Sequence, residues 1–198
     1  MTLPNQLTIL RIILSPVFLI CFLSEVIWMK QAAILIYIVA AISDWYDGWL
    51  ARKFNYITSW GKFWDPLADK ILTSAAFIGF ALVSLIPWWM VIIIVGRDVL
   101  ITLLRVFADM KNFNFVTSYY AKWKTMLQMI FLYYLLILYV AKYTPEVNSV
   151  YGELISVLLN KELIFYVALT ITAITFHSGV IYIKRNWNII IRLAKIEN

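Results

Sequence analysis

Long apolar stretches alternate with short polar segments along the whole chain. Six of these stretches are candidates for membrane-spanning helices: residues 7–23, 32–50, 71–86, 88–106, 126–140 and 163–183. A helix that crosses a hydrocarbon core about 30 Å thick needs roughly 20 mostly apolar residues, and these stretches approach that length. The pattern therefore predicts an all-α, polytopic membrane protein with six transmembrane helices, built as a single domain that spans residues 1–198.

The polar segments include one short turn and one long loop. Pro87 lies between the third and fourth stretches and is followed by Trp88 and Trp89 with no charge nearby, as in a tight turn at the membrane interface. Residues 144–160 are the longest expected loop on the outer side. The leucine-rich second half of that loop is suited to lie along the interface.

Composition and charge add an orientation to this picture. The chain is 63% hydrophobic with a mean hydropathy of +0.83, which a water-soluble domain of this length would not carry. Three polar segments expected on one side (residues 52–70, 109–124 and the tail after 183) hold eleven lysines and arginines, whereas the opposite side holds Lys30, Lys142 and Lys161. The positive-inside rule therefore predicts that both termini are cytoplasmic.

The net charge of +6 has a second interpretation, because an affinity for anionic phosphates would produce the same excess. Nucleic acid is not expected as a partner. The basic residues lie between apolar stretches rather than along one soluble face.

Four of the eleven acidic residues are concentrated where the second stretch ends and the third begins. Asp44 and Asp47 are three residues apart, and Asp65 and Asp69 are four apart, so on helices each pair projects from one face. If the two helices are neighbours, the four carboxylates converge and need a compensating charge, which Mg²⁺, Mn²⁺ or Ca²⁺ supplies. The alternative is that they are capping and surface residues, since Asp65 before Pro66 resembles a helix N-cap.

The spacing of these aspartates resembles the signature of the CDP-alcohol phosphotransferase family at every defined position: Asp44-x2-Asp47-Gly48-x2-Ala51-Arg52-x8-Gly61-x3-Asp65-x3-Asp69. The resemblance covers nearly the whole chain. It implies a fold of six transmembrane helices, a homodimer, a metal site at the cytoplasmic edge, and a reaction that releases CMP.

Roles for individual residues follow from the same resemblance. It implies that the metal ligands are Asp44, Asp47, Asp65 and Asp69, that Asp69 is also the general base, and that the cofactor is Mg²⁺ or Mn²⁺, as two ions. Residues of this signature that touch the CDP-lipid are Gly48 and Arg52, and Thr58 falls where a hydroxyl side chain often lies. Two metal ions would clamp the pyrophosphate and stabilise an in-line displacement, which agrees with these roles.

Other segments bear on the acceptor alcohol. The opening residues 3–11, residues 65–70, Lys122-x-Lys124-Thr125 and Ser178-Gly179 resemble phosphatidylglycerophosphate synthases of this family. Asn5 and Thr8 are then candidate nucleotide contacts, although Asn5 is equally suited to cap a helix. Two features depart from that group: Gly96-Arg97-Asp98 stands where Ala-Arg-Glu is usual, and Leu103 stands where a glycine is usual.

Charged residues within and beside the later stretches indicate an anionic acceptor. Arg97 and Arg105 lie two turns apart on roughly one face of the fourth stretch, and a charge at that depth is costly without a function. Pairing with Asp98 and Asp109 is the structural alternative. The residues predicted to bind an acceptor phosphate are Arg97, Arg105, Lys122, Lys124 and Arg185.

Together with the charge pattern, the resemblance implies an enzyme of a bacterial cytoplasmic membrane, with its active site on the cytoplasmic side. It would transfer the phosphatidyl group from CDP-diacylglycerol to glycerol 3-phosphate. The first alternative is the same chemistry with an inositol phosphate, phosphatidylglycerol or serine as acceptor. The second is a cation transporter, but a transporter would place its acids near the bilayer midplane, whereas these aspartates lie at span ends beside Arg52 and Lys53.

Overall fold

The structure, a computed structural model, describes residues 3–54, 59–111, 113, 115 and 119–196. Within these ranges, the side chains of residues 3, 4, 45, 47, 48, 50–52, 54, 59, 60, 62 and 194–196 are not described. The described residues form seven helices and no strand: α1 (Leu3–Leu23), α2 (Ile27–Phe54), α3 (Ser59–Leu82), α4 (Trp88–Met110), α5 (Tyr119–Tyr143), α6 (Pro145–Leu158) and α7 (Lys161–Ile196). The all-α prediction is confirmed.

Each predicted apolar stretch lies on one helix, except that the third runs past the end of α3. Ser84 takes a left-handed backbone conformation (φ 59°) there. The Ser84 N–H donates to the carbonyl of Ala81 (3.0 Å) and the Leu85 N–H to that of Phe80 (2.9 Å), which closes the helix with a Schellman-type end. Residues 83–86 are therefore an apolar turn before Pro87, not part of the helix.

The segment expected as a long outer loop contains the helix α6. Pro145 begins this helix at a position where its missing N–H costs nothing. After α6, the Asn160 side chain accepts a hydrogen bond from the Glu162 N–H (2.8 Å) and caps α7. The loop prediction missed α6 because its apolar residues are too few to give a long hydrophobic stretch.

Four segments are long and apolar enough to cross a membrane, by length and composition: Asn5–Leu23, Ile27–Asp44, Tyr119–Tyr143 and Lys161–Leu193. Among the described residues, α3 and α4 do not meet that test. Both carry charged residues, including Asp69 and Lys70 on α3 and Arg97 and Asp98 on α4. The chain is an integral membrane protein, and the count of six spans stays a prediction.

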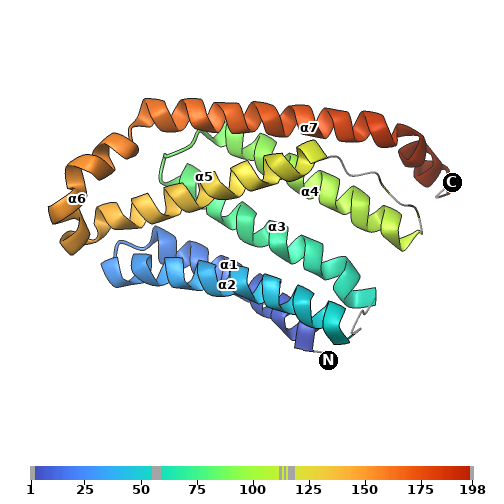
Figure 1. Cartoon of the computed structure of the whole chain (residues 1–198), viewed down its shortest axis with the longest axis horizontal. Coiled ribbons are helices and arrows are strands. Elements are labelled where there is room, and N and C mark those ends of the chain that lie inside the picture. The colour runs from blue at the N-terminus through green and yellow to red at the C-terminus, as the bar shows by residue number, and fades with distance from the viewer. Residues whose placement is uncertain (1–2, 55–58, 112, 114, 116–118, 197–198) are drawn as a thin grey trace.

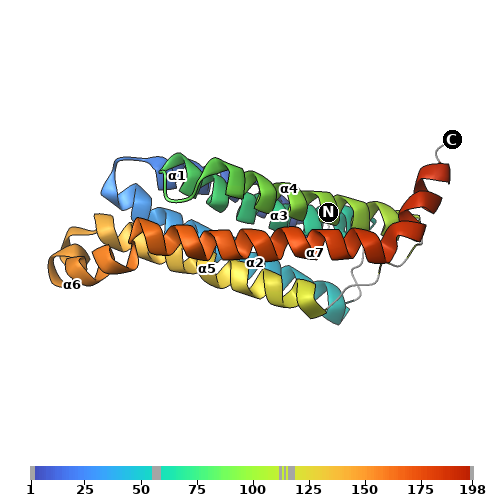
Figure 2. The same cartoon turned by 90° about the horizontal axis from the view of Figure 1, so that it is seen from above.

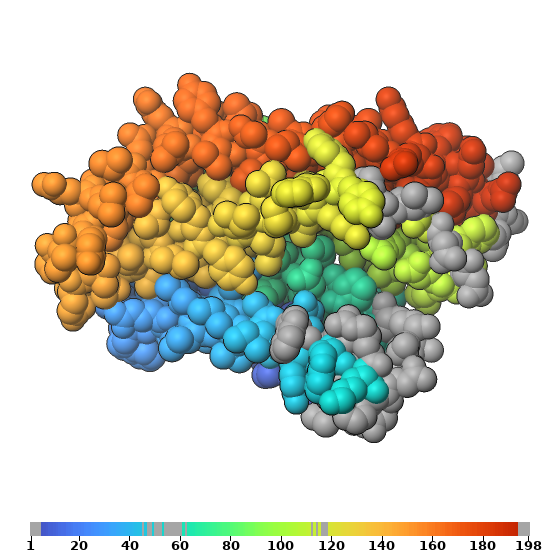
Figure 3. Space-filling model, in the orientation of Figure 1, coloured from blue at the N-terminus to red at the C-terminus, as the bar shows by residue number. Residues whose placement is uncertain are grey.

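The helices run back and forth along one long axis (Figures 1 and 2). The first residues of α1, α3 and α5 and the last residues of α2, α4 and α7 lie toward one end, while α6 and the connections α1–α2 and α3–α4 lie toward the other. Helix α1 packs on α2 and α3, α3 on α4, α4 on α7, and α5 on α2, α6 and α7. In the space-filling view, α2, α5, α6 and α7 make up most of the visible face, and α3 appears between α5 and α2 (Figure 3).

Aromatic side chains form much of the core between these helices. The Phe22 ring of α1 lies 5.6 Å from that of Phe80 on α3 and 4.9 Å from that of Tyr139 on α5. A Cβ at Gly79 would lie 3.0 Å from Cδ1 of Phe22, so this glycine permits the close approach of α1 and α3. The packing of α1 on α3 fixes the depth at which the polar residues of the two helices meet.

Candidate active site

Helix α1 holds one carboxylate from each of its two neighbours. Arg11 is fully buried, and its Nη1 lies 2.6 Å from Oδ1 of Asp44 on α2. The Thr8 hydroxyl, also fully buried, donates a hydrogen bond to the Asp65 carboxylate on α3. Thr8 and Arg11 are three residues apart and thus share one face of α1. One face of α1 therefore joins the two aspartate-bearing helices.

The third described carboxylate, Asp69, lies one helical turn after Asp65. Its Oδ2 is 2.7 Å from Nζ of Lys70. The negative charges of Asp69 and Asp65 both act on Asp44, so the three aspartates share one electrostatic environment. Asp47 lies on α2 one turn beyond Asp44, and its side chain is not described.

The donor set of this region suits a hard divalent cation. Asp44 and Asp69 keep 45% and 35% of their side chains exposed, so both have carboxylate oxygens open to a ligand. Burial raises the pKa of the Asp65 carboxyl, whereas the Thr8 hydrogen bond and the Arg11 charge oppose the rise. Among the described side chains, no group of three or more His, Cys, Asp or Glu is drawn together closely enough to hold an ion. The carboxylates are neighbours held by Arg11 and Lys70.

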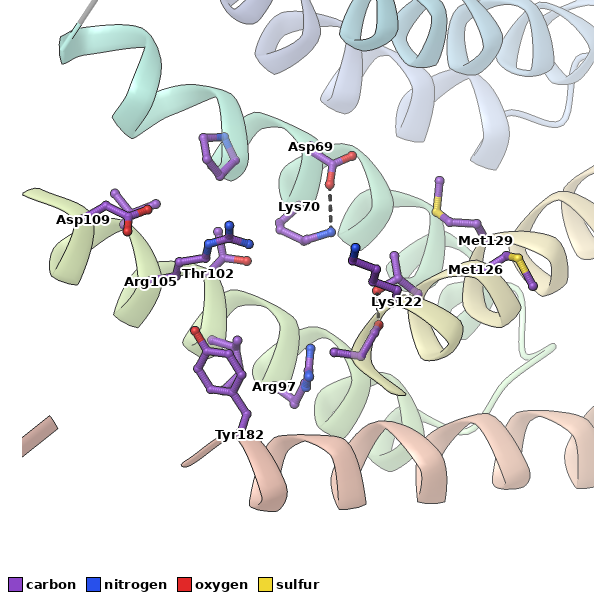
Figure 4. Close-up of a pocket in the computed structure, with 15 residues that line it drawn as sticks. Asp69, Lys70, Arg97, Thr102, Arg105, Asp109, Lys122, Met126, Met129 and Tyr182 are labelled. Atoms are coloured by element: carbon purple, nitrogen blue, oxygen red, sulfur yellow. Dashed lines mark hydrogen bonds and ion pairs between the residues drawn. The ribbon is translucent and has the colours of Figure 1, made fainter. Parts of the chain in front are cut away.

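A cavity of about 830 Å³ extends from Asp69 and Lys70 into the space between α3, α4, α5 and α7 (Figure 4). Its polar lining includes Asp69, Lys70, Arg97, Thr102, Arg105, Asp109, Lys122, Thr125 and Tyr182. Three of the five residues predicted to bind an acceptor phosphate, Arg97, Arg105 and Lys122, lie around this space. The predicted general base and the predicted phosphate-binding cations thus line one cavity.

The other two predicted phosphate-binding residues are placed differently. Lys124 is outside the lining and is only 1% exposed, and its ammonium contacts the Asp98 carboxylate. Arg185 lies on the exposed surface of α7, also outside the lining. A direct contact of either residue with an acceptor is thus less favoured than for Arg97.

Asp98 is the centre of a buried polar network on α4 and α5. It is 6% exposed. Oδ1 of Asp98 accepts from Lys124 and from Nη1 of Arg97 (3.0 Å), and Oδ2 accepts from Nε2 of Gln128 (3.0 Å). The structural alternative for Arg97, pairing with Asp98, is therefore present, and yet Arg97 also lines the cavity.

The residues predicted to meet the CDP-lipid are only partly described. Asn5 is half-buried near the start of α1, and Thr8 is engaged with Asp65. Gly48 and Arg52 lie on α2 beyond Asp44, with nothing of the Arg52 side chain described, and Thr58 lies outside the described residues. The two described residues are on the helix that contacts the aspartates.

Sequence reasoning missed three residues that shape the site. Arg11 was available as a signal, because an arginine inside an apolar stretch is costly unless it has a buried partner. Lys70 follows Asp69 directly and was considered as a charge that sets orientation and as part of the segment 65–70, but not as a partner of Asp69. Asp98 was considered as a partner for Arg97, but its bonds to Lys124 and Gln128 depend on how α4 packs on α5.

Comparison with known proteins gives a consistent assignment. The model of the CDP-alcohol phosphatidyltransferase family matches residues 1–175 of this chain. A protein of Bacillus subtilis (strain 168) named CDP-diacylglycerol–glycerol-3-phosphate 3-phosphatidyltransferase is 43% identical over 115 residues, which are 52% of this chain and 60% of the relative. A protein of Escherichia coli (strain K12) with the same name is 38% identical over 138 residues, 67% of this chain and 75% of the relative. The match thus spans only about three fifths of the Bacillus protein.

Proposed function

Because this chain belongs to the CDP-alcohol phosphatidyltransferase family, we propose that it transfers the phosphatidyl group of CDP-diacylglycerol to glycerol 3-phosphate, forming phosphatidylglycerophosphate and releasing CMP. The names of the Bacillus and Escherichia relatives support this acceptor. The observation that carries the proposal is the cavity itself, in which Asp69 shares one lining with Arg97, Arg105 and Lys122.

The charge of the cavity favours an acceptor that carries its own phosphate. A phosphate dianion is bound through charge-assisted hydrogen bonds, for which arginine and lysine are the usual donors. Serine has no phosphate and would leave these cations without a role. Inositol phosphate and phosphatidylglycerol also carry phosphate and remain the alternatives within the family.

The proposed reaction assigns a step to each part of the site. The cations hold the acceptor phosphate, and Asp69 takes the proton from the acceptor hydroxyl. The hydroxyl oxygen then forms a bond to the phosphorus of the phosphatidyl group, the bond from that phosphorus to the CMP oxygen breaks, and CMP leaves. Thr8 and Arg11 keep Asp65 and Asp44 in place from α1.

We propose that Asp44, Asp47, Asp65 and Asp69 hold Mg²⁺ or Mn²⁺, as two ions. Bound there, the ions would neutralise the pyrophosphate and stabilise the charge on the departing CMP. The CDP-lipid would be bound by Asn5, Thr8, Gly48, Arg52 and Thr58. Asn5 and Thr8 are on α1, beside the aspartates, which suits a nucleotide whose phosphates reach the carboxylate-bound ions.

The membrane arrangement proposed for this single catalytic domain has six spans, with both termini and the active site on the cytoplasmic side of a bacterial membrane, and two copies forming a homodimer. The charge asymmetry of the polar segments supports the orientation.

With Cys21 replaced by serine, a single cysteine introduced at Asn55 should resist an impermeant thiol reagent added to intact cells and react after permeabilisation. Labelling in intact cells would reverse the orientation.

One assay tests the function. The purified protein in detergent, with CDP-diacylglycerol and Mg²⁺ or Mn²⁺, is given glycerol 3-phosphate, inositol phosphate, phosphatidylglycerol or serine, and CMP release is measured. We expect release that depends on glycerol 3-phosphate and on the metal. Faster release with another alcohol would move the chain to a different acceptor within the family, and no release with any alcohol would contradict the transferase assignment.

A further inference from the structure

The stem of Arg97 passes close to the backbone of α7. A Cβ built at Gly179 on α7 would lie 3.0 Å from Cγ of Arg97 and 3.6 Å from its Nε. A carbon–carbon distance of 3.0 Å is shorter than ordinary contact, for which the optimum is about 3.5–4.0 Å. The Arg97 side chain therefore occupies the space that any other residue at position 179 would fill.

The guanidinium of Arg97 is fixed at one edge only. Its Nη1 pairs with Asp98 at 3.0 Å, and Asp98 is itself held by Lys124 and Gln128 from α5. Nε and Nη2 of Arg97 are buried, and neither has a hydrogen-bond partner in the described part of the chain. Buried donors without partners are costly, so a guanidinium with two of them is suited to an oxyanion ligand.

We propose that Gly179 is a specificity-determining position that acts through Arg97. Its missing side chain lets the stem of Arg97 lie against α7, while Asp98 fixes the other edge of the guanidinium, and together they set Arg97 to bind the phosphate monoester of the acceptor. This inference rests on the proposed function, because it assigns one of the cavity cations to the acceptor phosphate. Gly179 is a positioning residue and Arg97 is the contact.

A methyl group at position 179 should displace Arg97 without removing its charge. The stem must move by a few tenths of an ångström, and misplacement by about 1 Å at a reacting site can cost roughly a hundredfold. For Gly179→Ala we expect the KM for glycerol 3-phosphate to rise about three- to tenfold. The KM for CDP-diacylglycerol should change less than about twofold, because that substrate is assigned to the α1–α2–α3 side of the site.

The chain offers a matched control one residue from Arg97. A Cβ at Gly96, on α4, would meet nothing within 4 Å. Gly96→Ala is the same chemical change in a helix and alters helix propensity in the same direction. It should leave both KM values as in the wild type, so a difference between the two alanine variants reports the contact with Arg97.

A double-mutant cycle separates positioning from general packing. Alanine at position 97 has no Cγ, so in an Arg97→Ala background the Gly179→Ala change should have no further effect on the KM for glycerol 3-phosphate. An equal rise in both backgrounds, or an unchanged KM in Gly179→Ala, overturns the proposal. If Gly179→Ala does not fold, Arg97→Ala alone decides, because an unchanged KM would mean that Gly179 has nothing to position.

Failure of the inference can be told apart from failure of the proposed function. If the wild type releases no CMP with glycerol 3-phosphate, the proposed function fails. The two glycine variants are then compared with the alcohol that the wild type does use. Equal KM values for that alcohol in Gly179→Ala and Gly96→Ala would overturn the role of Gly179.

Discussion

Two polar regions adjoin inside this bundle, and their excess charges have opposite signs. The carboxylate region, formed by α1, α2 and α3, has Asp44, Asp65 and Asp69 against the buried Arg11. The cationic cavity, formed by α3, α4, α5 and α7, has Lys70, Arg97, Arg105 and Lys122 in its lining, with Asp69 and Asp109. Asp69 and Lys70 belong to both regions and pair with each other at 2.7 Å.

The difference indicates what each region lacks. Excess charge of one sign inside a bundle of apolar helices is unfavourable, and a ligand of the opposite sign relieves it. We therefore propose that cations complete the carboxylate region and that an anion completes the cationic cavity. Since Asp69 is at the boundary, the proposed proton acceptor would lie between the two proposed ligands, as transfer from a nucleotide lipid to a phosphorylated alcohol requires.

The largest effect should come from Asp69, the carboxylate that the two regions share. Asp69→Asn removes a negative charge and the proposed general base without changing volume, so turnover should fall by at least about a thousandfold, within the range usual for loss of a general base. The variant should still insert and elute as the wild type does. CMP release is measured at saturating concentrations of both substrates.

The control for this change is Asp109→Asn, which lines the same cavity from α4. It removes an equal charge from a residue outside the predicted signature, so turnover should change by less than about threefold. Wild-type turnover in Asp69→Asn would contradict the role of the carboxylate region, and equal losses in both variants would mean that the charge of the cavity, not Asp69, is what matters.

The second effect concerns the buried network beneath the cavity. Asp98→Asn leaves the ammonium of Lys124, only 1% exposed, without its counter-ion, and breaking one side of a buried pair costs about 3 kcal/mol or more. The free energy of unfolding in mild detergent, followed by denaturant titration, should fall by that amount. Replacing both partners with apolar residues, Asp98→Leu with Lys124→Met, should recover most of the loss, because no buried charge is then left unpaired.

These two outcomes distinguish stability from binding at Lys124. If Lys124 contacts the acceptor, Lys124→Ala raises the KM for glycerol 3-phosphate even when the protein is as stable as the double variant. If Lys124 acts only through Asp98, Lys124→Ala lowers the free energy of unfolding, and the KM for glycerol 3-phosphate changes only as far as Arg97 is displaced. A wild-type unfolding curve for Asp98→Asn would contradict the buried pair.

A smaller effect is expected at the exposed side of the cavity. Arg105 lines the cavity from α4, two turns beyond Arg97. Loss of one charge-assisted phosphate contact costs about 1.5–3 kcal/mol, so Arg105→Ala should raise the KM for glycerol 3-phosphate roughly ten- to a hundredfold. The KM for CDP-diacylglycerol should be nearly unchanged.

Lys111→Ala is the control for Arg105, since Lys111 is an exposed cation that ends α4 outside the cavity lining. It should leave the KM for glycerol 3-phosphate as in the wild type. Equal increases in the KM for glycerol 3-phosphate in both variants would indicate a general attraction of anions to a basic surface. That result would contradict binding of the acceptor in the cavity.

The sequence predicted the helices well because the apolar stretches are long. It could not predict that α2 and α3 continue beyond their apolar parts, to Phe54 and back to Ser59, and these extensions carry part of the aspartate signature. Helix α6 was missed because 14 residues are too short for the hydrophobic pattern of a span.

The two regions were predictable to different degrees. The carboxylate region has a fixed spacing along the chain, so its aspartates were identified from the sequence. The cationic cavity joins residues from four helices; Arg97, Arg105 and Lys122 were identified from the sequence, but Lys70 and the Asp98 partner that orients Arg97 were not. Contacts such as Arg11 to Asp44 and Lys124 to Asp98 depend on tertiary packing, and local spacing contains no information about them.

The smallest effect is expected far from both regions, where a buried cation has no proposed ligand. Lys30 on α2 is 7% exposed, and its Nζ lies 3.9 Å from the ring centre of Tyr143 and 5.2 Å from that of Tyr139, both on α5. Here the aromatic faces stabilise the charge, so the cation needs no anionic ligand.

Lys30→Met keeps the length of the side chain and removes the charge, and it should lower the free energy of unfolding by about 1 kcal/mol. Both KM values should stay as in the wild type, because this end of the bundle is opposite the site (Figure 1). A changed KM for glycerol 3-phosphate in this variant would mean that stability alone alters acceptor binding, and the effects expected for Arg105 and Gly179 would then need to exceed that background to be assigned to the cavity.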